Sequence, residues 1–79
     1  MTLHALDEAR KIVGLSHDGL WIRYFALGGT APPIEVNGYL NGLFTLGAGE
    51  HNVLALALNE AFFDLGLDHP LGYREVLEP

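Results

Sequence analysis

Apolar residues recur along the chain at the spacing of α-helices, in segments that glycines separate. The first segment, residues 3–13, places Leu6, Ala9 and Val13 on one face and ends before Gly14. The fourth segment has the longest apolar stripe and also ends before a glycine. It covers residues 50–65, with Leu54, Ala57, Leu58, Ala61, Phe62 and Leu65 in the stripe. Both segments are predicted to be amphipathic helices.

The second segment is apolar on almost every side. A serine suited to an N-cap precedes residues 17–27, and glycines follow them. In a helix, Leu20 and Tyr24 share one face, while Trp21 and Phe25 share another. A helix without a polar face is either central to a core or shared with a partner. A strand is the alternative, because Trp, Ile, Tyr and Phe favour sheets.

Residues 34–44 fit two structures. Gly38 and Gly42 each cost a helix about 1 kcal/mol relative to alanine. Asn37-Gly38 is also a typical two-residue hairpin turn. We favour the helix, with the glycines allowing a close helix crossing, because five apolar positions fit its period. These positions are Val36, Tyr39, Leu40, Leu43 and Phe44.

Together the segments predict an all-α fold, a compact bundle of about four short helices in a single domain over residues 1–79. Residues 67–79 show no clear period and are expected to form an irregular tail. The chain has no cysteine, so neither a disulfide nor a thiolate metal site is available. A chain of 79 residues forms only a marginal core, so stability must come from packing, or from packing plus self-association.

The charge of the chain is unevenly distributed. The formal net charge is −6, and residues 41–79 carry six acids against one base. Binding to phosphate backbones depends on Lys and Arg, so nucleic-acid binding is not expected. The third and fourth segments do outline a helix-turn-helix, whose recognition helix would begin Glu50-His51-Asn52. A DNA-binding transcriptional regulator is therefore an alternative function.

The location of the protein is predicted from the absence of targeting patterns. No run of about 18 apolar residues exists, so no membrane span is expected. The early acids Asp7 and Glu8 are not typical of a secretory signal. We therefore expect a cytoplasmic protein, and the low lysine content beside abundant Leu, Ala and Gly is typical of a bacterial one.

Histidines are the main candidates for chemistry. His17 precedes Asp18, and His51 follows Glu50, but neighbours along a helix point in different directions and form no dyad. The chain contains no nucleophile elbow, phosphate loop or His-Glu-x-x-His motif. We expect no enzyme, no metal and no cofactor. A small enzyme or metal site built from His17, His51 and His69 is the second alternative.

The chain has more large apolar side chains than one small core is expected to hold. Phe62 and Phe63 are consecutive, so a helix cannot bury both against the same neighbour. Phe63 shares its face with Asn59 and Glu60, which are expected to be solvated. Alternatively, Asn59 hydrogen-bonds to a loop backbone, for example near Gly28-Gly29, as a structural polar anchor. An exposed aromatic residue among polar ones indicates a contact surface. The alternative is that the tail covers Phe63.

The predicted function is therefore a non-enzymatic protein–protein interaction module, a small homodimeric regulatory protein with an acidic surface. An acidic rim on the contact surface would favour a basic partner protein. The predicted contact residues are Trp21, Arg23, Phe25, Glu60, Phe62, Phe63, Asp64 and Asp68.

Overall fold

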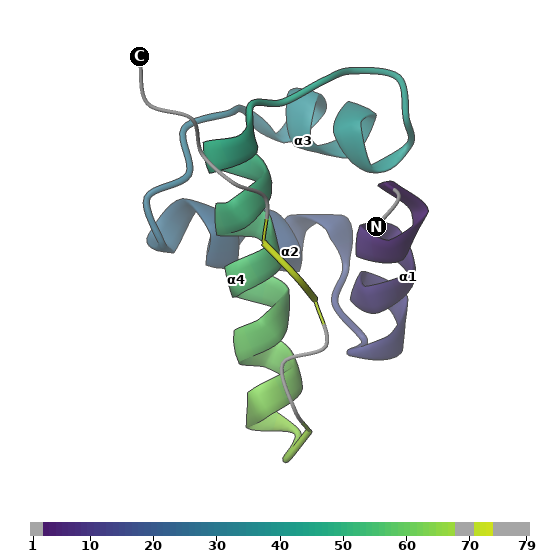
Figure 1. Ribbon diagram of the computed structural model, residues 1–79, viewed down its shortest axis with the longest axis vertical. Coiled ribbons are helices and arrows are strands. Elements are labelled where there is room, and N and C mark those ends of the chain that lie inside the picture. The colour runs from purple at the N-terminus through teal and green to yellow at the C-terminus, as the bar shows by residue number, and fades with distance from the viewer. Residues whose placement is uncertain (1–2, 68–70, 74–79) are drawn as a thin grey trace.

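The computed structural model describes residues 3–67 and 71–73 of the chain (Figure 1). This part of the chain contains four α-helices and no strands. They are α1 (Leu3–Ile12), α2 (His17–Ala26), α3 (Pro33–Leu40) and α4 (Ala48–Asp64). The predicted all-α bundle of four short helices is confirmed. None of the described helices is long and apolar enough to cross a membrane.

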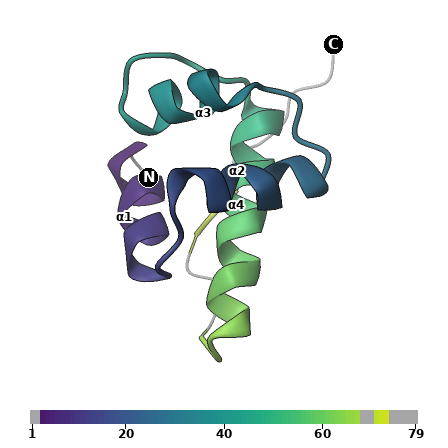
Figure 2. The same ribbon diagram turned by 180° about the vertical axis from the view of Figure 1, so that it is seen from behind.

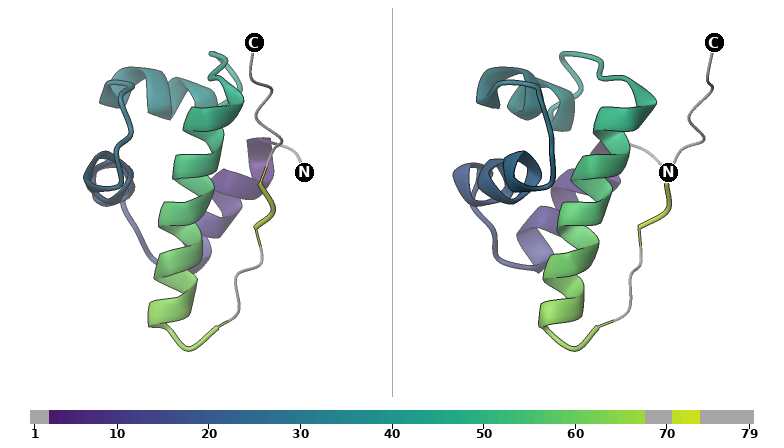
Figure 3. Two further views of the ribbon diagram at one scale, coloured as in Figure 1. Left: turned by 60° about the vertical axis from the view of Figure 1, so that its left-hand side comes forward. Right: turned by 90° about the vertical axis from the view of Figure 1, so that its left-hand side faces the viewer.

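The long helix α4 is the axis about which the other elements pack. The short helix α2 crosses α4 steeply on one side (Figure 2). Residues 71–73 run beside α4 on the opposite side (Figure 3). Helix α1 contacts both α3 and α4, and α3 also contacts α2. Every helix therefore contributes one face to a shared core.

The core is built from aliphatic and aromatic side chains, most of them on the four helices. Its buried members are Leu6, Ala9, Leu20, Tyr24, Ala31, Val36, Tyr39, Leu40, Leu54, Ala55, Ala57, Leu58, Phe62 and Leu71. The predicted stripes of α1 and α4 face inward, with one correction: Leu65 lies just beyond the end of α4 and is 59% exposed.

The apolar second segment forms a helix and not a strand. The hydroxyl of Ser16 accepts a hydrogen bond from the N–H of Gly19 at 3.0 Å, as an N-cap should. Leu20 and Tyr24 are buried, whereas Ile22 and Phe25 are exposed. The helix is therefore covered on one face only, and it presents large apolar side chains on the other.

The third segment is a helix, as favoured, but it ends at Leu40 and not at Phe44. Gly42 has a φ of +79°, a conformation that favours glycine and ends helices. The N–H groups of Leu43 and Phe44 then both donate to the carbonyl of Gly38, at 2.7 and 3.2 Å. A Cβ at Gly38 would lie 2.1 Å from the Phe44 ring, so this glycine makes room for an aromatic ring rather than for a helix crossing.

Candidate interaction surface

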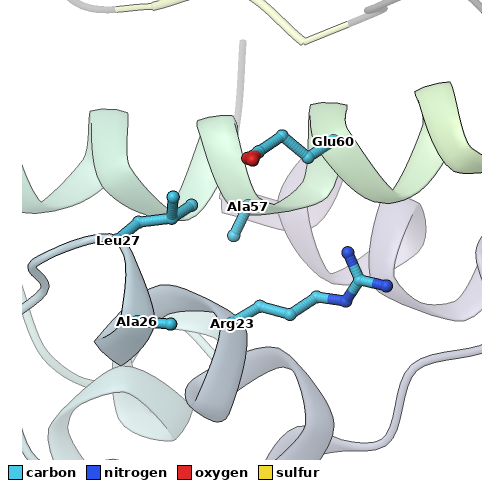
Figure 4. A pocket seen from close by; sticks show the side chains of 5 residues that line it. All are labelled: Arg23, Ala26, Leu27, Ala57 and Glu60. Atoms are coloured by element: carbon cyan, nitrogen blue, oxygen red, sulfur yellow. The ribbon is translucent and has the colours of Figure 1, made fainter.

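Two small side chains leave a hollow where α2 crosses α4. Ala26 near the end of α2 faces Ala57 on α4, and Arg23, Leu27 and Glu60 complete the lining (Figure 4). The hollow has a volume of about 150 Å³. Ala57 is buried, so the floor of the hollow is part of the core. The shape of the hollow is therefore set by the packing of two helices and not by a loop.

A second hollow of about 270 Å³ adjoins the first along α4. Arg23 and Glu60 line both hollows, so the two are neighbours with a shared wall. We call the combined feature the α2–α4 groove. It is lined by Arg23, Ala26, Leu27, Ala57, Glu60, Phe63 and Asp64.

The charges of the groove have both signs. The Nη1 atom of Arg23 lies 3.3 Å from Oδ2 of Asp64, an ion pair that links α2 to α4. Because both side chains are largely exposed, this pair contributes little to stability, about 0–1 kcal/mol. Glu60 forms no ion pair within the described part of the chain. One cation and two acids therefore border an otherwise apolar groove.

Two exposed phenylalanines stand on the helices that form the groove. Phe63 on α4 lines it and is 67% exposed, and Phe25 on α2 is 60% exposed. The Phe25 ring stacks on the half-buried ring of Trp21, with centroids 5.0 Å apart. The Nε1 of Trp21 donates to the carbonyl of Ala31 at 2.9 Å, which fixes the indole ring. The Phe25 ring is thus held in place by Trp21, and the Phe63 ring stands on the packed helix α4.

The predicted contact residues do not all lie on this surface. Phe62 is only 6% exposed and belongs to the core, because α4 turns it about 100° away from Phe63. Phe62 is therefore not part of this surface. Trp21 supports the Phe25 ring. Arg23, Glu60 and Asp64 are brought together, and Asp68 lies outside the described residues.

The prediction that Asn59 is solvated is wrong, and the alternative of a structural polar anchor holds, with Leu71 as the partner instead of the loop at Gly28-Gly29. Its side chain is fully buried and hydrogen-bonds to the backbone of Leu71. The chain beyond α4 returns along the helix and covers this position. No local pattern specifies this contact, because Asn59 and Leu71 lie 12 residues apart in sequence. Phe63 is 67% exposed, and most of the tail that was its alternative cover lies outside the described residues.

His51 and His17 each contact a different partner. His51 is buried on α4, and its Nδ1 lies 2.7 Å from the Tyr39 hydroxyl. The Nε2 of His17 lies 3.9 Å from Oδ1 of Asp7, and His69 lies outside the described residues. No group of three or more His, Asp or Glu side chains in the described part of the chain is arranged to hold a metal ion.

Asp7 itself is paired within its own helix. Arg10 donates to Oδ1 of Asp7 at 2.9 Å. Burial disfavours the charged carboxyl, but this hydrogen bond and the positive charges of Arg10, Lys11 and His17 outweigh burial and lower the pKa of Asp7. The carboxylate is thus engaged in structural ion pairs.

The start of α4 is engaged by the loop after α2. The Tyr24 hydroxyl donates to the Glu50 carboxylate, which also accepts from the Thr30 N–H at 2.9 Å. The hydrogen bonds from Tyr24 and Thr30 lower the pKa of Glu50, whereas burial and the Glu50 hydrogen bond raise the pKa of Tyr24. With Glu50 bound in this way and His51 buried, the predicted DNA-recognition helix begins with two residues that face the protein.

Comparison with protein-family models, curated proteins and solved structures finds no match for this chain.

Proposed function

We propose that this protein is a non-enzymatic protein-interaction module that binds another polypeptide at the α2–α4 groove. The observation that carries the proposal is the groove itself, which has a core floor and an exposed phenylalanine on each of its two helices. Large apolar side chains clustered beside a hollow are typical of docking surfaces. In this role the protein would regulate its partner by covering the partner's binding surface.

The residues that line the groove indicate which interactions would hold a partner there. Covering Phe25 and Phe63 removes apolar surface from water, which stabilises a complex by about 25 cal/mol per Å². Glu60 and Asp64 at the edge favour a partner that offers a positive charge there. The ion pair of Arg23 with Asp64 helps to orient that partner.

The dimensions of the hollows favour binding of a protein over catalysis on a small molecule. Ligand pockets usually have volumes of about 300–1,000 Å³ and enclose most of the ligand. The two hollows of the groove, about 150 and 270 Å³, are smaller and open to solvent along their length. Their lining combines apolar side chains with Arg23, Glu60 and Asp64, and holds no nucleophile with a base beside it.

The proposal is tested by site-specific photo-crosslinking in cells that express the protein. p-Benzoylphenylalanine replaces Phe63, which lines the groove, Phe25 on the exposed face of α2, or Ile12 on α1 as the control. Ile12 and Phe63 are equally exposed, at 67% each, so probe accessibility is matched. We expect protein adducts from Phe25 and Phe63 and few from Ile12.

A second change shows whether the adducts come from the groove. Ala26 lines the first hollow and is exposed, so Ala26→Arg should fill the hollow without disturbing the core. We expect this substitution to suppress the Phe63 adducts. Equal adducts from Ile12 and Phe63, or none from either, would overturn the proposed function.

A further inference from the structure

The partner at the groove is the question that the proposed function leaves open, and the inference here rests on that function. We propose that the groove binds a second copy of this chain, forming a dimer with twofold symmetry in which α2 and α4 of each protomer pack against α2 and α4 of the other. In such an interface the same surface serves both protomers, so it must be complementary to itself in shape and in charge.

The charges of the groove meet this condition through Arg23. The sequence has no Lys or Arg between residues 24 and 73, yet Arg23 lies among the groove acids Glu60 and Asp64. A surface that bound only basic partners would bind them better without this cation. A surface that binds itself needs both signs. A twofold axis lets Arg23 of each protomer meet Glu60 of the partner subunit.

The shape of the groove meets the condition through Phe63. A cavity of about 150 Å³ is large enough to hold a benzene ring, and the hollow between Ala26 and Ala57 has this volume. Glu60 lies midway in sequence between Ala57 and Phe63 on α4. An axis beside Glu60 therefore places Phe63 of each protomer over the hollow of the other. The same axis brings the two Glu60 carboxylates together, and Arg23, which lines the same hollow, supplies the positive charge between them.

The exposed apolar side chains of the groove supply part of the area that a dimer requires. A fully covered aromatic side chain buries about 150–250 Å². Phe63, at 67% exposure, therefore offers roughly 100–170 Å² per protomer. Leu27 also lines the groove and is partly exposed, and Leu56 is exposed on α4. A standard interface buries ~800 Å² per partner, so the polar edge with Arg23, Glu60 and Asp64 must be covered as well.

The charge pairing is tested by exchanging the two signs between separate chains. In Arg23→Glu both interface charges become negative, and in Glu60→Arg both become positive, so each variant repels a copy of itself. A mixture of the two restores both ion pairs in a heterodimer. Lys11→Glu is the control, because it reverses the charge of an exposed side chain on α1 that does not line the groove.

Light scattering over a concentration series and native mass spectrometry supply the readout. We expect the wild type and Lys11→Glu to reach twice 8.6 kDa, and each groove variant alone to associate at least about tenfold more weakly. The equimolar mixture should form a one-to-one heterodimer with affinity near that of the wild type. A monomeric wild type, or a mixture that associates no better than its components, would overturn the inference.

Two further variants test the packing of the ring into the hollow. Phe63→Ser removes the ring and Ala26→Arg fills the hollow, and both should give a monomer whose urea unfolding matches that of the wild type diluted to a monomer. A dimer that persists in both variants would be held by another face, and the inference would be wrong. If the wild type is monomeric but Phe63 still crosslinks to a different protein, the second copy is excluded while the proposed function stands.

Discussion

The side-chain amide of Asn59 pairs with both backbone polar groups of Leu71. Its Oδ1 accepts from the Leu71 N–H at 3.0 Å, and its Nδ2 donates to the Leu71 carbonyl at 2.9 Å. Both residues are buried, so water cannot replace these bonds. The Nδ2 also donates to the Tyr73 hydroxyl at 3.0 Å. One side chain on α4 thus positions the segment that closes this side of the core.

We expect Asn59→Ala to lower the free energy of unfolding by about 2–3 kcal/mol, because it leaves two buried backbone groups without partners. Urea denaturation measures the loss, and hydrogen exchange should show that the Leu71 amide loses its protection. Asn41→Ala, at an exposed position outside the core, is the control and should change stability by less than about 0.5 kcal/mol. An amide that stays protected in Asn59→Ala would contradict this role.

The cluster of Tyr24, Thr30 and Glu50 makes stability depend on pH. The pKa of Glu50 is lowered in the folded protein, so the ionised carboxylate is the form that stabilises the fold. This contribution is complete above the pKa of the unfolded chain, about 4.3, and is lost as pH falls through the lower pKa of the folded protein.

Glu50→Gln should therefore be less stable than the wild type at pH 7, by about 1 kcal/mol, and the difference should shrink toward pH 3. Urea unfolding at pH 3, 5 and 7 measures this. Asp7, whose pKa is also lowered, keeps part of the acid sensitivity in the variant. Glu35→Gln, at an exposed position on α3, is the control. A stability difference that does not change with pH would count against the cluster.

Gly38 and Phe44 are expected to be energetically coupled. Alanine at position 38 improves helix propensity by about 1 kcal/mol, but its Cβ would displace the Phe44 ring. Gly38→Ala should therefore give little or no gain in the wild type. In a Phe44→Ala background it should stabilise the protein by about 0.5–1 kcal/mol. A double-mutant cycle by urea denaturation measures the coupling, and equal effects in both backgrounds would refute it.

Two tyrosine hydroxyls provide a matched comparison of buried and exposed hydrogen bonds. Tyr39→Phe removes the buried partner of His51 Nδ1 and should cost about 1–3 kcal/mol. Tyr73 lies on the exposed side, and its partner Asn59 keeps its bonds to Leu71. Tyr73→Phe should therefore cost less than about 0.5 kcal/mol. Thermal unfolding of both variants decides whether the ranking holds.

Some residues of the groove could be predicted from the sequence pattern alone. Consecutive residues on a helix point about 100° apart, so Phe62 and Phe63 had to face different surroundings. The pattern did not say which of the two faces inward. Arg23 and Asp64 were both predicted contact residues, but only the crossing of α2 over α4 places them 3.3 Å apart. The Ala26–Ala57 hollow had no sequence signal, because alanine is common in every helix.

The sequence by itself determined the four helices and the turns that separate them. Helical hydrogen bonds join residues four apart, and caps such as Ser16 act within one turn, so short windows of sequence contain the necessary information. The tertiary structure alone decided which faces are covered and that Asn59 and Glu50 bind segments far along the chain. Those outcomes depend on packing between distant segments, whose free energy no local pattern contains.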